Sequence, residues 1–130
     1  MGKDGFVSLW IGNIDSQDLL DEYAELIYTD EGEWLPSPFL GDFNINMDDF
    51  DEDFIEKVCH GNEVMTLSEL ISGCSYEDVV ILKFINMYGD KLPNDINSAV
   101  LLYNFGYNGN TKEVQKDELN FKYIGTVSYK

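Results

Sequence analysis

Carboxylates are the most abundant side chains of this sequence that could take part in chemistry. Its 130 residues include 25 Asp and Glu. Carboxylates can act as general acids and bases, as oxygen ligands for a metal ion, or as a surface that attracts cations. With so many acids, pairs at glycosidase-like spacing arise by chance. Paired carboxylates alone therefore do not predict an active site here.

One acidic run has part of the pattern of a calcium loop. Asp49, Asp51 and Asp53 show the alternate spacing of oxygen ligands in such a loop. The rest of an EF-hand is absent, because Phe54 stands where the loop needs glycine and His60 where it needs a bidentate glutamate. We therefore expect no dedicated metal site.

Nucleophilic chemistry would have to use Cys59, Cys74 or the single histidine, His60. Cys59 and His60 are adjacent, so on a strand their side chains point to opposite faces. The two cysteines do not form a C-x-x-C pair, and one histidine cannot build a two-histidine metal centre. We expect two reduced thiols, no catalytic residue and no cofactor, and a metallohydrolase is disfavoured.

The net charge restricts the possible partners more strongly than any motif does. Eight lysines and no arginine oppose the 25 acids, which gives a formal charge of −17. Such a chain lacks the cations that contact phosphates, so direct binding to nucleic acid or to an anionic membrane is disfavoured. A basic protein is the expected partner. The competing interpretation is a well-solvated surface that only aids solubility.

Length and hydropathy indicate one domain, residues 1–130. A chain of this size with 44% hydrophobic residues can bury a core without disulfides or metals. It has no apolar run of about eighteen residues that could span a membrane. Its first dozen residues also lack the basic start and cleavage site of a signal peptide. We expect a cytoplasmic protein.

The elements that position these groups follow from periodicity. Residues 6–12 are rich in aromatic and β-branched residues, which predicts a first strand with Trp10 in the core. Asp15 or Ser16 can cap a helix whose apolar stripe extends over residues 19–27. This helix is expected to pack on the sheet.

An acidic turn follows that helix. In residues 28–34, acids surround Gly32 between aromatic ends, which is typical of a hairpin or a tight loop. Pro36 and Pro38 exclude a regular central strand, and residues 39–43 predict a short helical turn.

The second half of the chain contains both predicted strands and predicted helices. Residues 54–60 predict a strand, and Thr66 opens a capping box for a short helix. Ser75 gives a second, weaker capping signal for a longer helix that Gly89 would end.

Residues 99–105 and 119–129 predict two strands, which we expect to pair with each other as a long antiparallel hairpin. The complete order of elements predicts an α+β fold in a single domain, with a mainly antiparallel β-sheet and helices packed on one face.

Four segments together resemble the immunity 22 family. They are Phe6-Val-Ser-Leu-Trp-Ile-Gly12, Pro36-Ser-Pro-Phe-Leu-Gly-Asp-Phe43, Ala99-Val-Leu-Leu-Tyr-Asn-Phe105 and Phe121-Lys-Tyr-Ile-Gly125. This family, first catalogued as a domain of unknown function, comprises predicted bacterial immunity proteins of α+β fold with a characteristic tryptophan, which Trp10 would match. The resemblance implies a protein that binds and neutralises a polymorphic toxin and needs no catalysis.

The acidity suggests what such a toxin would be. An acidic surface would steer and occupy the basic cleft of a nuclease, so we expect a basic toxin, in particular a nuclease. Trp34 lies among acids and is a candidate aromatic anchor, although core packing is the alternative for it. The residues expected to face the toxin are Glu31, Glu33, Trp34, Asp48, Asp49, Asp51, Glu52 and Asp53.

Two other functions remain open at this level. A DNA-mimic regulator would use the same acidic surface to bind a basic DNA-binding protein, and differs in its partner only. A small enzyme using two carboxylates would need a deep pocket containing acids of raised pKa.

Overall fold

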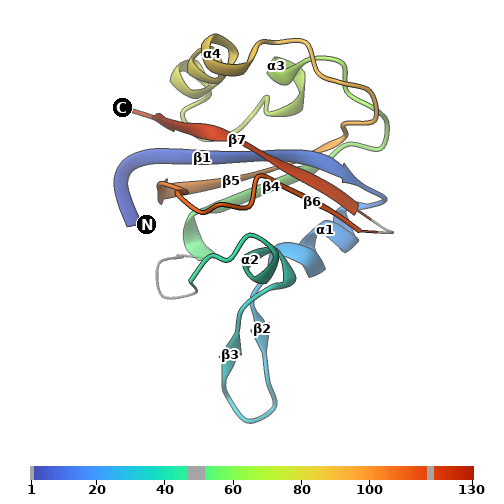
Figure 1. Cartoon of the computed structure of the whole chain (residues 1–130), viewed down its shortest axis with the longest axis vertical. Coiled ribbons are helices and arrows are strands. Elements are labelled where there is room, and N and C mark those ends of the chain that lie inside the picture. The colour runs from blue at the N-terminus through green and yellow to red at the C-terminus, as the bar shows by residue number, and fades with distance from the viewer. Residues whose placement is uncertain (1, 47–51, 117–118) are drawn as a thin grey trace.

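The computed structural model describes residues 2–46, 52–116 and 119–130 (Figure 1). The elements in chain order are β1 (Gly2–Ile14), α1 (Gln17–Ala24), β2 (Ile27–Tyr28), β3 (Trp34–Leu35), α2 (Pro38–Asp42), the 3₁₀ turn η2 (Glu52–Phe54), β4 (Ile55–Cys59), α3 (Leu67–Leu70), α4 (Glu77–Tyr88), β5 (Ser98–Phe105), β6 (Glu113–Gln115) and β7 (Leu119–Ser128).

Five of the strands form one antiparallel sheet in the order β4-β5-β1-β7-β6, with β1 at its centre. The short strands β2 and β3 form a separate two-stranded ribbon. This architecture confirms the predicted α+β class and its mainly antiparallel sheet.

The central strand β1 is apolar on both of its faces. Its side chains alternate, so that Val7, Leu9 and Ile11 enter one buried cluster while Trp10 and Ile14 enter another. A strand that is covered on both sides reads as a nearly continuous apolar run, which explains the composition of this segment.

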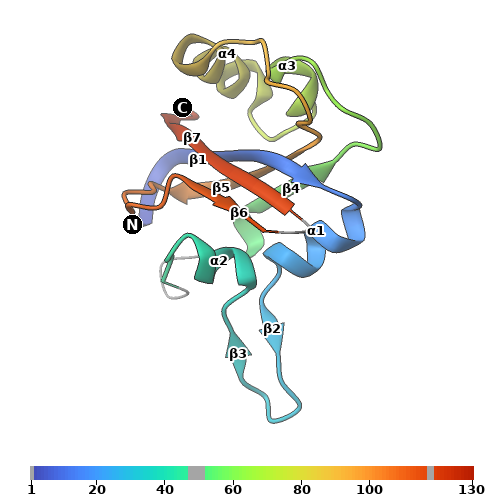
Figure 2. The same cartoon turned by 45° about the vertical axis from the view of Figure 1, so that its right-hand side comes forward.

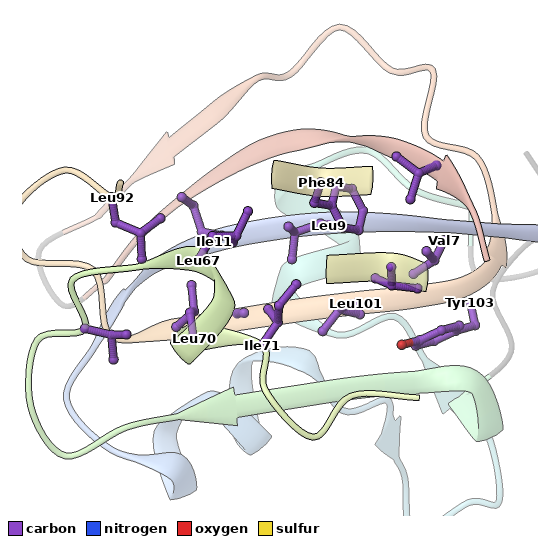
Figure 3. Close-up of a cluster of buried hydrophobic side chains, with 14 residues drawn as sticks. Val7, Leu9, Ile11, Leu67, Leu70, Ile71, Phe84, Leu92, Leu101 and Tyr103 are labelled. Atoms are coloured by element: carbon purple, nitrogen blue, oxygen red, sulfur yellow. The ribbon is translucent and has the colours of Figure 1, made fainter. Parts of the chain in front are cut away.

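Helices cover both faces of the sheet, which corrects the prediction that they share one face. In Figures 1 and 2, α3 and α4 lie on one side of the sheet, and α1 and α2 lie on the other. On the α3/α4 side, Leu9 and Ile11 pack with Leu67 and Phe84 (Figure 3). The prediction was wrong because β1 and β5 are apolar at successive positions and both of their faces need cover.

The expected hairpin of the last two long strands is also wrong. β5 and β7 do not pair with each other; they lie on opposite sides of β1 and each pairs with it. The hairpin partner of β7 is β6, which lies in the segment between β5 and β7. The prediction paired the two strands because they follow one another in the sequence. In the structure, the long strand β1 has two edges, and β5 and β7 each pair with one of them.

Most of the predicted helix ends are confirmed. The Ser16 side chain accepts a hydrogen bond from Leu19 N at 3.2 Å at the start of α1. The Thr66 hydroxyl accepts one from Glu69 N at 3.2 Å at the start of α3. Gly89, at a φ of 104°, ends α4.

The start of α4 differs from the prediction. Its N-cap is Tyr76, in a left-handed conformation and without a side-chain capping bond, rather than Ser75. The Ser75 hydroxyl instead donates to Glu56 Oε2 at 2.5 Å. A carboxylate on β4 therefore competes successfully for the expected cap.

Trp10 is fully buried, as predicted, at the centre of an aromatic cluster. Its ring centroid lies 5.1 Å from that of Phe39, 5.8 Å from Phe43, 5.3 Å from Tyr107 and 5.2 Å from Tyr123. The first three pairs have edge-to-face geometry, which aromatic rings favour. Trp10 thus joins α2 and the segment after β5 to the central strand.

Trp10→Ala should lower the free energy of unfolding by ~3–5 kcal/mol, because it leaves a cavity where four rings meet. Urea denaturation followed by far-ultraviolet circular dichroism measures this loss without relying on tryptophan fluorescence. A loss below ~1 kcal/mol would mean that the cluster does not organise this face of the sheet.

Candidate interaction surface

The ribbon of β2 and β3 projects from the body of the protein on the side that carries α1 and α2 (Figure 2). We refer to residues 27–35 as the acidic hairpin. Tyr28 pairs with Trp34, and Thr29 N donates to Glu33 O at 2.8 Å. At the turn, Gly32 has a φ of 86°, a left-handed conformation that glycine adopts without steric cost. The hairpin prediction is confirmed.

Large apolar side chains of the acidic hairpin are exposed. Tyr28 is 61% exposed and Trp34 48%, and their ring centroids lie 4.7 Å apart. Their neighbours Ile27 and Leu35 are exposed as well. Such a patch contributes nothing to the core, and exposed apolar patches with polar rims mark interaction sites. Of the two interpretations of Trp34, the structure supports the exposed one.

The turn of the acidic hairpin carries exposed carboxylates at Asp30, Glu31 and Glu33. Residues 27–35 contain no lysine. Of the ion pairs formed within the described residues, none includes these three acids. Their negative charge therefore remains available to an external cation.

The acids at the base of the acidic hairpin are balanced in part. Lys57 Nζ lies 3.6 Å from Oδ1 of Asp21 on α1 and 3.3 Å from Oε1 of Glu25, the C-cap of that helix. Lys116 Nζ lies 2.7 Å from Asp42 Oδ2 at the end of α2. These ion pairs connect α1 to β4 and α2 to the β6 region. The paired carboxylates near the sheet therefore help to hold the fold together, whereas the carboxylates at the hairpin turn do not.

The structure brings together three of the predicted partner-facing residues, Glu31, Glu33 and Trp34, on the acidic hairpin. Asp48, Asp49 and Asp51 lie outside the described residues. Glu52 begins η2, and Asp53 is exposed within the same turn.

Sequence reasoning did not select Tyr28, although it is the most exposed aromatic residue of the acidic hairpin. The signal was present in the sequence. An aromatic residue on each side of an Asp-Glu-Gly turn predicts a cross-strand aromatic pair once the hairpin is accepted. A two-stranded ribbon cannot by itself cover both rings of such a pair.

The thiols show no sign of activation. Burial, which disfavours the thiolate, raises the pKa of Cys74 to about 11. Burial and the charge of Asp15 also raise the pKa of Cys59. Both thiols are therefore protonated at neutral pH, unlike the thiolates of reactive cysteines. His60 Nε2 lies 3.1 Å from Leu70 O, so the ring helps to hold α3 against β4.

Within the described segments, no three His, Cys, Asp or Glu side chains are grouped so as to hold a metal ion. None of their helices has the length and apolar character needed to cross a bilayer.

The fold and surface together are those of a small, acidic α+β protein with a projecting aromatic hairpin. Residues 7–130 match the family model described as immunity protein 22, and the chain belongs to this family. No curated protein and no solved structure matches the chain. Membership in a family of immunity proteins supports a role in toxin immunity, and implies an inhibitor that binds a toxin rather than an enzyme.

Trp34→Ala should lower the free energy of unfolding by less than ~1 kcal/mol, because the side chain contacts its own ribbon and not the core. The same urea titration that is used for Trp10→Ala provides the comparison. A loss as large as that of Trp10→Ala would show that the acidic hairpin supports the fold instead of presenting a free surface.

Proposed function

We propose that this protein neutralises a basic toxin of the nuclease class by inserting the acidic hairpin into the toxin's cationic cleft. The observation that supports the proposal is the Tyr28–Trp34 pair, exposed on a projecting ribbon whose carboxylates have no ion-pair partner within the described residues.

The two kinds of side chain would serve different steps of binding. Tyr28 and Trp34 belong to the residue types that dominate interface energetics, where truncation of one anchor costs roughly 2 kcal/mol or more. The carboxylates at the tip would steer the encounter with a basic surface and raise the association rate at low salt.

A nuclease is the toxin class that fits this charge best. The cleft of a nuclease must attract phosphates, and carboxylates on a narrow ribbon present negative charge of the same kind. Binding alone would then exclude the nucleic acid. In this proposal the whole chain, residues 1–130, acts as one cytoplasmic domain without a metal, a cofactor or a catalytic step.

We propose that the acidic run at residues 48–53 also contributes to the attraction of the toxin. Replacing its five acids, Asp48, Asp49, Asp51, Glu52 and Asp53, by Asn or Gln should slow association with the toxin and weaken the dependence of the rate on salt, while circular dichroism remains unchanged. Stopped-flow kinetics at two salt concentrations tests this. Unchanged kinetics would place the interface elsewhere.

The partner can be obtained by low-salt capture on the immobilised chain from a nuclease-treated bacterial lysate, with elution by increasing salt. We expect one toxin-bearing polypeptide. Several DNA-binding proteins released at modest salt would contradict the proposal and favour the DNA-mimic function.

With the toxin in hand, Trp34→Ala should raise the dissociation rate about 30-fold or more, whereas the double change Glu31→Gln and Glu33→Gln should mainly lower the association rate at low salt. Surface plasmon resonance separates the two rates.

A matched control is the double change Asp78→Asn and Glu113→Gln, which removes two exposed acids from α4 and β6. This control should leave the dissociation rate unchanged and affect association less than the hairpin pair does. Equal effects of the two charge pairs would show that only total charge matters.

A further inference from the structure

A concave site lies at the β4 edge of the sheet, between the η2–β4 segment and the start of α4. Its volume is about 360 Å³. The lining residues are Asp53, Phe54, Ile55, Glu56, Ser75, Tyr76, Tyr103 and Tyr129. We refer to it as the tyrosine pocket. It is separate from the acidic hairpin, because Tyr103 belongs to the buried cluster on the α3/α4 face and Tyr129 packs against that cluster.

Three tyrosine rings form the walls of the tyrosine pocket. Tyr76 and Tyr129 are stacked, with ring centroids 4.5 Å apart and planes inclined by 27°. Tyr103 meets Tyr129 edge to face, with centroids 5.6 Å apart. Tyr76 is exposed at the rim, whereas Tyr103 is buried at the base. Such an arrangement presents aromatic surface in more than one direction to an entering group.

Hydrogen bonds fix the two inner rings. Tyr103 Oη donates to Ser75 O at 2.7 Å, and Tyr129 Oη donates to Asn104 Oδ1 at 2.5 Å. The same Asn104 oxygen accepts from Gly5 N at 3.0 Å. The ring orientations are therefore set before any ligand arrives, which lowers the entropy lost on binding.

Tyr76 is held in a conformation that few bulky residues adopt. Its φ is 61° and its ψ 32°, in the left-handed region that favours Gly and Asn. No side-chain capping bond accompanies it at the start of α4. In this conformation the exposed ring of Tyr76 stacks on Tyr129. Residues with a strained backbone cluster at ligand-binding sites.

A carboxylate is held in place at the lining of the tyrosine pocket. Glu56 accepts two hydrogen bonds from Ser75, one from its backbone N at 2.9 Å and one from its hydroxyl at 2.5 Å. None of the ion pairs within the described segments includes Glu56. Its charge is therefore oriented, and no lysine of those segments neutralises it.

The chain's own lysines lie over other aromatic rings. The lysine–ring contacts are Lys3 with Phe6, Lys112 with Tyr123, Lys116 with Tyr23, and Lys122 with Tyr88. Lys83 donates to the carbonyl oxygens of Ser128 and Lys130 instead. In the part of the chain that the structure describes, no lysine lies over a ring of the tyrosine pocket.

We propose that the tyrosine pocket binds the guanidinium of an arginine side chain supplied by the toxin. A planar guanidinium can stack on tyrosine rings while it donates to a carboxylate, a combination that an ammonium group cannot match. The charge of Glu56, the stacked rings and the absence of arginine from this chain all fit an external arginine. This inference rests on the proposed function and gives the toxin a second anchor point.

The first test uses N-acetyl-arginine methylamide as the probe, titrated at low salt while the tyrosine ring signals are followed by NMR. We expect saturable shifts confined to the tyrosine pocket. The neutral isostere N-acetyl-citrulline methylamide should bind at least about fivefold more weakly. Equal binding of the two probes, or shifts spread over the acidic hairpin, would overturn the proposal.

Tyr76→Asn is the most informative variant, because asparagine tolerates the left-handed backbone while the ring is lost. It should retain the thermal stability of the parent chain and weaken probe binding at least about fivefold, and Glu56→Gln should do the same. Leu82→Ala, at an exposed position of α4 outside the tyrosine pocket, is the matched control and should bind the probe normally. Unchanged probe affinity in Tyr76→Asn would contradict the proposal.

Toxin binding separates this inference from the proposed function. Tyr76→Asn should speed dissociation of the toxin about fivefold while Trp34→Ala retains its own larger effect. If only Trp34→Ala weakens the complex, the arginine inference fails and the hairpin proposal stands. If neither variant weakens the complex, both fail.

Discussion

The whole structure depends on the burial of β1 on both of its faces. A strand that is apolar at successive positions must be covered on both of its faces. β1 therefore occupies the centre of the sheet and has a pairing partner on each side. Buried Asn97 secures one end of it, since its side chain accepts from Ile14 N at 3.1 Å and donates to Ile14 O at 2.9 Å. Trp10 secures β1 through side-chain packing, because α2 is attached to the sheet through this ring.

This arrangement leaves the acidic hairpin free for another role. Both sheet faces are already covered, by α3 and α4 on one side and by α1 and α2 on the other, so residues 27–35 are not needed to complete a core. An isolated two-stranded ribbon is only marginally stable in water, and exposing Tyr28 and Trp34 on it gives no stability that the fold requires. Their presence there, among carboxylates that repel one another, is better explained by a partner surface than by folding.

The sequence predicted the local features well and the long-range ones poorly. Ser16, Thr66 and Gly89 determine helix ends through bonds or backbone conformations within a few residues, and they were found where expected. The pairing of β5 and β7 with β1 joins residues about a hundred positions apart and leaves no local signal. For the candidate interaction surface, the sequence was sufficient to select Glu31, Glu33 and Trp34 as a prediction, whereas the tyrosine pocket combines residues from four separate segments and required the fold.

Hydrogen–deuterium exchange of the chain, alone and in complex with its toxin, tests most directly whether the acidic hairpin is the toxin-binding element. In the free protein, the amides of this exposed ribbon should exchange fast, because few contacts hold it closed. In the complex, slowed exchange should be greatest in residues 27–35, with β1 unchanged. Protection elsewhere, with the hairpin exchanging as fast as in the free chain, would contradict the proposed mode of binding.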